Sequence, residues 1–328
     1  MEPNARITII GAGPGGLCVA LALARKGARV RVLEQRSGSS EVGAGVQLSS
    51  NGGFVLRALG IYETIFNLSV PAEGVELYDA LSAKCVGFVD LNKYKSGPAH
   101  LMAHRQDLIC VLEAACRKAG VEIILNEKVL EISSFDPVRF HTNTGENTAD
   151  LLVCADGIHS MGRAAVLGEA TPFFTGQTAW RLVIPNTSNH PNMARIFMAP
   201  KKHVVSYPIR GGALINLVFV EERASWVKES WSEKSTGAAL QDTFQEFASV
   251  IPLSKEIQDP YIWGLFRHPV ASNWSKGKVV LMGDAAHPTL PFMAQGANLA
   301  LEDAWVLSDA LSKVEGIKEG LRQYQSRR

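Results

Sequence analysis

Four glycines near the N-terminus have the spacing that a dinucleotide-binding turn requires. The run Gly11-Ala-Gly13-Pro-Gly15-Gly16 fits the pattern G-x-G-x-x-G. In that pattern the first glycine permits a tight turn, the second lets the backbone approach a pyrophosphate, and the third lets a helix pack closely on a strand. The N–H groups at the start of that helix carry a partial positive charge, so they attract the same pyrophosphate. A glycine-rich turn without a ligand is the alternative.

Three acidic residues follow strand-like runs, at the positions where a parallel sheet places its ligands. Glu34 comes 23 residues after Gly11 and could accept hydrogen bonds from both hydroxyls of a ribose. Asp156 and Asp284 each follow an apolar run. A solvated Glu34, and a turn-forming or helix-capping role for each aspartate, are the simpler alternatives. Taken together, the four strand ends predict one long, hydroxyl-rich ligand.

The elements that must position these residues predict an α/β fold. A β-branched strand at 7–10, an Ala/Leu-rich helix at 17–26 and a strand at 29–33 make one β-α-β unit. Further strand-like runs lie at 121–125, 151–154 and 278–282. A helix with one apolar face is indicated by Leu108, Leu112, Ala115 and Ala119. This order of elements predicts a doubly wound parallel sheet.

Two segments, 75–99 and 173–269, are instead rich in alternating or β-type runs broken by Pro, Gly and Asn. We therefore predict a Rossmann-like domain with an interleaved β-sheet substrate domain. The first would comprise residues 1–74, 100–172 and 270–328, and the second would comprise the two β-rich segments. Near the end of the chain, an apolar helical stripe from Val314 to Tyr324 needs a surface to pack on.

The composition argues against several classes of protein. The 328 residues are 46% hydrophobic and 20% charged, with a net charge of +1, which excludes disorder, collagen and coiled coil. This charge balance argues against a nucleic acid or an anionic membrane as partner. No uncharged apolar run reaches the roughly 18 residues of a membrane span, and the polar start leaves no room for a signal peptide.

The cysteines and histidines predict neither a disulfide framework nor a metal site. The five cysteines are an odd number and include no C-x-x-C pair, which fits a reducing cytoplasm. His100 and His104 have helical spacing, but no third ligand lies near them in the sequence, so no metal is expected. The expected assembly is a monomer or a homodimer.

Three motifs in order resemble those of the single-component FAD-dependent aromatic hydroxylases, the group A flavoprotein monooxygenases. They are the glycine turn, Asp156-Gly157, and the run 283–288 followed by 291–303. Within that family the chain is most similar to the salicylate-hydroxylase type, which acts on hydroxybenzoates and hydroxynicotinates, and the likeness covers essentially the whole chain. The resemblance implies FAD as cofactor, NADH or NADPH as a transient electron donor, with NADH preferred, and O2. A single dinucleotide motif agrees with a nicotinamide donor that has no domain of its own.

The resemblance also implies which residues hold FAD. The ADP half would be held by Gly11, Gly13, Gly16, Glu34 and Arg36. Arg105 would lie along the pyrophosphate and ribityl region, and Asp284 would bind a ribityl hydroxyl. Gly296, Ala297 and Asn298 would begin a helix whose N-terminus faces the pyrimidine edge of the flavin, where reduced flavin is negatively charged.

A flavin hydroperoxide transfers an electrophilic oxygen, so its site needs an electron-rich phenol, a base and apolar walls. His203 and Tyr207 lie four apart in a predicted strand and so share a face. Histidine exchanges a proton near neutral pH. The alternative is that His203 lies at a loop end and Tyr207 in the core.

Other candidates come from the approaches to the flavin. Gln47 is at the family position that faces the ring, and a structural amide is its alternative. Pro291, Phe292, Met293 and Gln295 would line the substrate side of the flavin, or simply form a rigid turn before a helix. Arg181 and Arg210 could bind a substrate carboxylate, with a solvated surface arginine as the alternative for each.

We therefore expect an FAD-dependent, NAD(P)H-consuming monooxygenase that hydroxylates a hydroxylated aromatic acid. One alternative is another flavin reaction, epoxidation or halogenation, although the halogenase pattern W-x-W-x-I-P is absent because 179–185 holds one tryptophan. A second alternative is a non-catalytic dinucleotide-binding redox sensor. Family members generally continue with more helices after the segment that ends at Arg328, which leaves it open whether the chain is active.

Overall fold

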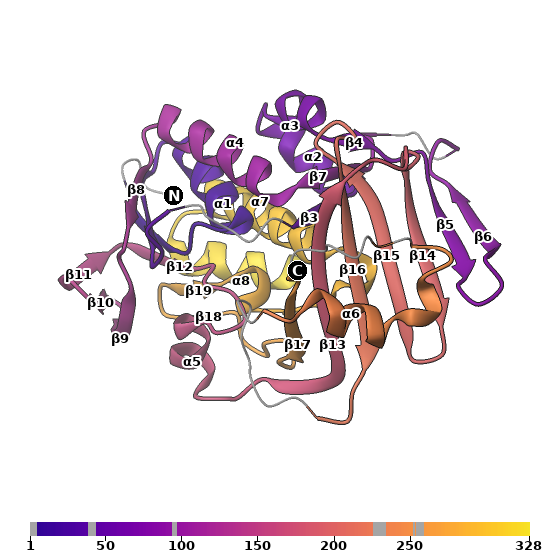
Figure 1. Ribbon diagram of the computed structural model, residues 1–328. Coiled ribbons are helices and arrows are strands. Elements are labelled where there is room, and N and C mark those ends of the chain that lie inside the picture. The colour runs from indigo at the N-terminus through magenta and orange to yellow at the C-terminus, as the bar shows by residue number, and fades with distance from the viewer. Residues whose placement is uncertain (1–4, 39–43, 94–96, 226–233, 252, 254–258) are drawn as a thin grey trace.

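The protein is described from a computed structural model, which defines residues 5–38, 44–93, 97–225, 234–251, 253 and 259–328. A six-stranded sheet with strand order β18-β19-β12-β1-β2-β8 forms the centre of the α/β part (Figure 1). Its neighbouring strands are parallel except β18 and β19. The strands are β1 Arg6–Ile10, β2 Arg29–Glu34, β8 Glu122–Leu125, β12 Leu151–Cys154, β18 Ser275–Lys276 and β19 Val279–Leu281. The predicted parallel sheet is confirmed.

Helices cover this sheet because their apolar faces and its central strands bury one another. α1 (Pro14–Ala24) starts directly after the glycine turn, with Pro14 in its first turn, where a missing N–H costs nothing. α4 (Arg105–Lys118) and α7 (Gly296–Lys313) both contact α1. Ile7 and Ile9 of β1 lie in the same hydrophobic core. The order β1, α1, β2 is the predicted β-α-β unit.

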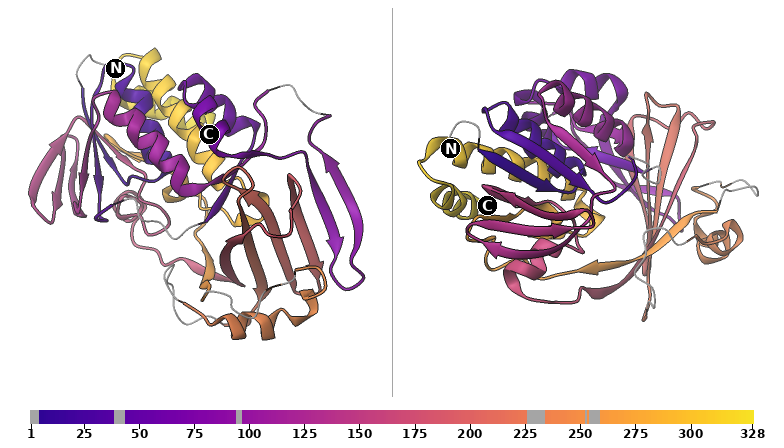
Figure 2. Two further views of the ribbon diagram at one scale, coloured as in Figure 1. Left: turned by 45° about the horizontal axis from the view of Figure 1, so that its top comes forward. Right: turned by 90° about the vertical axis from the view of Figure 1, so that its left-hand side faces the viewer.

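A seven-stranded sheet, with order β17-β13-β16-β15-β14-β5-β6, stands to one side of the α/β part (Figure 2). It is antiparallel except where β14 pairs with β5. The strands are β5 Gly74–Asp79, β6 Lys84–Asp90, β13 Phe173–Pro185, β14 Met193–Ala199, β15 Lys202–Ile209, β16 Leu214–Glu222 and β17 Tyr261–Arg267. Two β-rich segments that are distant in sequence thus form one sheet.

Two three-stranded sheets complete the strands of the described residues. One joins β3 (Gly45–Leu48), β7 (Leu101–His104) and β4 (Val70–Pro71). The other is a meander of β9 (Val129–Phe135), β10 (Val138–Thr142) and β11 (Gly145–Ala149), which the sequence analysis did not predict. One face of each meander strand is solvated, so none of them forms the continuous apolar run that marks the central strands in the sequence.

The remaining helices connect or flank these sheets. They are α2 Ser50–Ala58, α3 Tyr62–Leu68, α5 Met161–Leu167, α6 Gly237–Thr243, α8 Ile317–Arg327 and the short 3-10 turns η1 Gln245–Phe247, η2 Gly283–Ala285 and η3 Pro291–Met293. The apolar stripe from Val314 to Tyr324 is interrupted, because α7 ends at Lys313 and α8 begins three residues after Val314. Leu321 and Tyr324 of α8 are buried in the main core, which supplies the packing surface that the stripe needs.

Candidate active site

One cavity of about 890 Å³ lies between the carboxyl ends of the central sheet and one face of the seven-stranded sheet. Gly13 and Gly15, which follow β1, line it together with Asp284, which follows β19. His203 and Tyr207 line it from β15. The cavity therefore joins the predicted dinucleotide turn to the predicted substrate strand.

The glycines of the turn differ in what surrounds them, and the differences match their expected uses. Gly11 has a φ of +100°, and a Cβ there would lie 2.6 Å from the Ala155 carbonyl oxygen. A Cβ at Gly16 would lie 2.0 Å from the Gly11 carbonyl oxygen, so the helix packs too closely on the strand for a side chain. At Gly13 no atom lies within 4 Å of the Cβ position. The backbone at Gly13 is thus open to a ligand, while Gly11 and Gly16 serve the turn itself.

Glu34 is fixed beside this turn at the end of β2. Its Oε2 accepts the Ala12 N–H at 2.8 Å, and its Oε1 accepts the Arg36 N–H at 2.9 Å. The Arg36 guanidinium lies 3.8 Å from Oε1. An open backbone at Gly13, the N-terminus of α1 and an acid held at the next strand end fit the ADP half of FAD.

The two aspartates that follow strands have different surroundings. Asp284 lines the cavity and is exposed to it. Desolvation by the protein around it raises its pKa, and the nearby charge of Arg105, which also lines the cavity, opposes that rise. Asp156 is not among the lining residues. It accepts hydrogen bonds from the Ser160 hydroxyl at 2.5 Å and the Gly162 N–H at 3.2 Å, at the start of α5. Asp156 thus makes the helix-capping contact that was its simpler alternative.

Asp303 holds the Asp284 turn in place, a role that the sequence did not indicate. Its side chain is 0% exposed. The carboxylate accepts hydrogen bonds from the Gly283 N–H at 2.7 Å, from His287 Nε2 at 2.6 Å and from Arg328 Nε at 2.6 Å. Burial by itself would lower the pKa of His287, but the hydrogen bond and charge of Asp303 outweigh burial and raise it. A buried, multiply bonded carboxylate therefore anchors η2 to α7.

The start of α7 faces the cavity with its backbone. Gly296 and Ala297 line the cavity, as do Pro291 and Met293 of the preceding turn. Met293 is exposed, at 78%. This arrangement presents helix N–H groups to the cavity, as expected for the site of a negatively charged flavin edge.

Two predicted contact residues beside them have side chains that hold other elements. The Gln295 Nε2 donates to the Ser49 hydroxyl at 3.1 Å. The Asn298 Nδ2 donates to the Gln47 carbonyl oxygen at 3.0 Å, and its Oδ1 accepts the Ser49 N–H at 3.0 Å. Neither residue lines the cavity. The side chains of Gln295 and Asn298 thus tie α7 to β3 and to the residue before α2.

His203 and Tyr207 point from β15 into the same cavity, as their spacing predicts. His203 makes an edge contact with the Phe292 ring, with the ring centroids 5.6 Å apart. Burial lowers the pKa of His203, so its imidazole is neutral near pH 7. Burial also raises the pKa of Tyr207, whose hydroxyl therefore keeps its proton. The pair offers a neutral base and a hydroxyl donor on one face.

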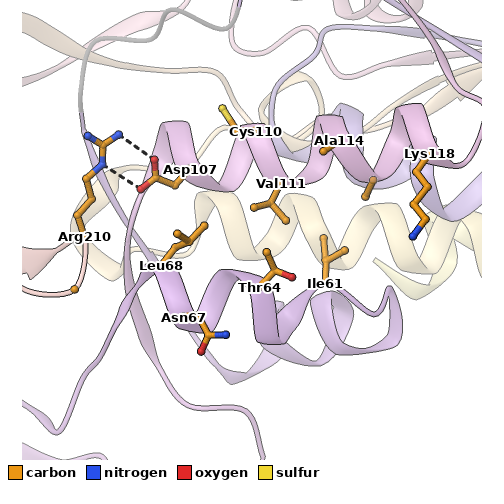
Figure 3. A pocket seen from close by; sticks show the side chains of 12 residues that line it. Ile61, Thr64, Asn67, Leu68, Asp107, Cys110, Val111, Ala114, Lys118 and Arg210 are labelled. Carbon is orange, nitrogen blue, oxygen red and sulfur yellow. Dashed lines mark hydrogen bonds and ion pairs between the residues drawn. The ribbon is translucent and has the colours of Figure 1, made fainter.

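The two candidate arginines lie in different places. Arg181 of β13 lines the cavity, and its guanidinium lies 4.5 Å from the centre of the Trp263 ring. Arg210, at the β15–β16 turn, lies in a separate cleft between α3 and α4 (Figure 3). Its Nε and Nη2 donate to the Asp107 carboxylate at 3.1 and 2.9 Å. The structure thus brings Arg181 to the site and does not bring Arg210 there.

Gln47 lines the cavity from β3, and its neighbour there is a residue that the sequence analysis set aside. The His100 Nε2 lies 2.9 Å from Gln47 Oε1, and His100 also lines the cavity. The helical spacing of His100 and His104 is coincidental, since His104 ends strand β7 and His100 precedes it. Only the pairing of β3 with β7 brings His100 to Gln47, so no local pattern could have indicated it.

Comparison with known proteins decides the family. A family model described as an FAD binding domain matches residues 4–328. The chain belongs to this FAD-binding family. Its relatives include 3-hydroxybenzoate 6-hydroxylase 1 of Aquipseudomonas alcaligenes, 35% identical over 98% of this chain and 84% of the relative. The 6-hydroxynicotinate 3-monooxygenase of Bordetella bronchiseptica is 30% identical over 94% of this chain and 83% of the relative.

Solved structures agree on the fold of this flavoprotein. CtdE in complex with FAD and a substrate has a TM-score of 0.87 at 20% identity, covering 98% of this chain and 84% of that one. Klebsiella pneumoniae HpxO, complexed with FAD and uric acid, has a TM-score of 0.83 at 23% identity, covering 98% and 84%. The resemblance to single-component FAD aromatic hydroxylases is confirmed, and with it FAD as cofactor and an enzymatic, monooxygenase function.

Proposed function

We propose that this flavoprotein hydroxylates a hydroxylated aromatic acid of the hydroxybenzoate or hydroxynicotinate class, using NADH or NADPH and O2. The main support is the single cavity, which joins the glycine turn and the start of α7 to His203, Tyr207 and Arg181. When bound, FAD takes electrons from the nicotinamide and activates O2 for insertion into the ring. The names of the relatives support the same substrate class.

In this proposal the sheet domain selects and activates the acid. Neutral His203 accepts the phenol proton, and the hydroxyl of Tyr207 donates to the same region. Arg181, which lies over the Trp263 ring, binds the carboxylate, because a planar guanidinium matches that group. Val205, Val218 and Leu265 form the apolar wall that excludes water.

The cofactor contacts proposed for this chain follow the geometry. Gly13 and Gly15 lie along the pyrophosphate, and Glu34 binds the adenosine ribose. Arg105 and Asp284 bind the pyrophosphate and ribityl region, and Gly296 and Ala297 face the flavin. Arg36, beside Glu34, contacts the ADP half with it. Gly11, Gly16, Asp156, Gln295 and Asn298 do not line the cavity and support the residues that do.

We further propose two domains with the boundaries predicted from the sequence, a cytoplasmic location, a monomeric or homodimeric state, and no nucleic-acid partner. Two β-rich segments that share one sheet support the domain division. Among the described residues, no helix combines the length and the apolar character that crossing a bilayer demands.

The test is NADH oxidation by the FAD-loaded protein with 3-hydroxybenzoate, 4-hydroxybenzoate, salicylate and 6-hydroxynicotinate, with the products separated by chromatography. We expect one acid to stimulate NADH oxidation and to yield a hydroxylated product. If the protein binds FAD but none of the aromatic acids stimulates its NADH oxidation, the proposed substrate class is contradicted.

Arg181→Met and Arg210→Met make a matched pair of variants for the carboxylate contact. Since a hydrogen bond to a charged group contributes about 1.5–3 kcal/mol, Arg181→Met should raise KM for the acid roughly 10- to 100-fold. Arg210→Met should leave KM nearly unchanged, because Arg210 pairs with Asp107 outside the cavity. Equal effects in the two variants would remove Arg181 from the substrate site.

A further inference from the structure

Contacts from β16, from α7 and from His100, the residue before β7, hold Gln47 and its strand. The Gly45 N–H donates to Asn216 Oδ1 of β16 at 2.7 Å, and the Gln47 carbonyl oxygen accepts from Asn298 of α7 at 3.0 Å. The side-chain oxygen of Gln47 lies 2.9 Å from His100 Nε2. Asn216 and Asn298 are both 0% exposed. The backbone of β3 is therefore fixed from both sides, and His100 decides how the Gln47 amide is turned.

The remaining hydrogen-bonding capacity of Gln47 lies in its NH2 group. Among the described residues no partner is found for Gln47 Nε2, and Gln47 lines the cavity. On the same strand face, two residues away, a Cβ at Gly45 would lie 2.5 Å from the Tyr207 hydroxyl. The Gln47 amide therefore lies on the face of β3 that the Tyr207 hydroxyl of β15 approaches.

The imidazole of His100 carries one proton, which sits on either Nδ1 or Nε2. Burial is the cause that lowers its pKa, so the imidazole is neutral and carries a single N–H. If that N–H is on Nε2, it donates to Gln47 Oε1 and leaves both amide hydrogens of Gln47 for another acceptor. The other titratable or charged side chains lining the cavity are Arg105, Arg181, Lys201, Lys202, His203, Tyr207, Glu221, Glu222 and Asp284.

We propose that His100 is a positioning residue, which holds Gln47 Oε1 so that the Gln47 NH2 group donates a hydrogen bond to the ring oxygen of the substrate. This inference rests on the proposed function, since it names the residues that favour the phenolate form of the acid. A donor stabilises an anionic phenolate more than a neutral phenol, so binding makes the phenol more acidic. The amide remains unchanged throughout, and the phenol proton leaves to His203.

The test uses 4-hydroxy-3-nitrobenzoate, whose phenolate form is coloured, bound to the FAD-loaded protein without NADH. A pH titration of the difference spectrum gives the pKa of the bound phenol, and it requires no turnover. Three variants separate the roles: His100→Leu removes the donor, His100→Gln keeps an N–H donor near the Nε2 position, and Gln47→Leu removes the amide. His141→Leu, on the β10 strand of the meander, is the matched control.

We expect His100→Leu and Gln47→Leu each to raise the bound phenol pKa by about one unit, a tenfold change in its ionisation, and His100→Gln to restore the wild-type value. The double variant should shift no further than either single variant, because both remove one hydrogen bond. The His141→Leu control should match the wild type.

Two results would overturn the inference, in distinguishable ways. An unchanged phenol pKa in His100→Leu, or a lower one, would mean that His100 does not hold Gln47 as a donor, while the proposed function would stand. If the wild-type protein fails to bind the nitro analogue, or any acid of the test panel, the proposed substrate class fails, and the role of His100 fails with it.

Discussion

Single residues show where short patterns suffice and where they do not. The spacing of His203 and Tyr207 predicts a shared face, and both side chains line the cavity. Arg210 has no local signal that distinguishes it from Arg181, and only the fold shows it paired with Asp107. His100 is invisible to sequence reasoning because its partner Gln47 is 53 positions away.

His203 is the residue that we expect to act as the base for the phenol proton. If it accepts the phenol proton, His203→Ala should keep FAD bound but lower the hydroxylated product formed per NADH by tenfold or more. Because burial lowers the pKa of His203, the neutral base persists below the usual histidine range, so wild-type hydroxylation should be lost only below about pH 6.5. Product yield per NADH across a pH series measures both effects. Unchanged coupling in His203→Ala would remove the histidine from the reaction.

At the scale of elements, the strand, turn and helix at the N-terminus were the most predictable part. A β-branched run, glycines at fixed spacing and an Ala-rich helix each favour one local structure, and they agree. The meander β9–β11 was missed because its strands are half solvated and lack the continuous apolar runs of the central strands. The helix-capping contact of Asp156 was foreseen only as the alternative, since a ligand contact and a helix cap place the same residue after a strand.

Gly13→Ala and Gly16→Ala test the separate uses of the glycines within one turn. Gly16→Ala should destabilise the protein by about 1–3 kcal/mol or prevent folding, because its Cβ would meet the Gly11 carbonyl oxygen. Gly13→Ala should fold with nearly wild-type stability, since its Cβ meets no atom, yet bind FAD more weakly. Thermal unfolding without FAD and flavin fluorescence titration report the two effects. A loss of stability in Gly13→Ala, together with weaker FAD binding but unchanged stability in Gly16→Ala, would contradict the roles given to the two glycines.

At the scale of the whole molecule, the arrangement of two sheets around one cavity follows from non-local pairings. β5 and β6 join strands more than a hundred residues further along the chain, where β14 pairs with β5 in parallel. Composition and alternation indicate that both segments are β-rich, but not that they share a sheet. The cavity forms where the sheet they build faces the strand ends of the α/β part.

The network around Asp303 should make the stability of the whole fold depend on pH. The pKa of His287 is higher in the folded state than in the unfolded state. The ion pair of His287 with Asp303 therefore contributes its full free energy of folding below the usual histidine pKa, and this contribution is lost as pH rises through the raised pKa. Wild-type unfolding midpoints should therefore fall relative to those of His287→Gln as pH rises from 6 through that value. Urea unfolding at each pH measures this difference. A constant difference between the two proteins would contradict the linkage.

The most direct test of the central claim is isotope labelling with ¹⁸O2 during NADH-dependent turnover of the acid that stimulates the enzyme. Mass spectrometry of the product measures where the new oxygen atom comes from. A monooxygenase predicts one ¹⁸O atom in each hydroxylated product molecule. A product that carries oxygen from water, or NADH oxidation that yields only hydrogen peroxide with every acid tested, would contradict the account.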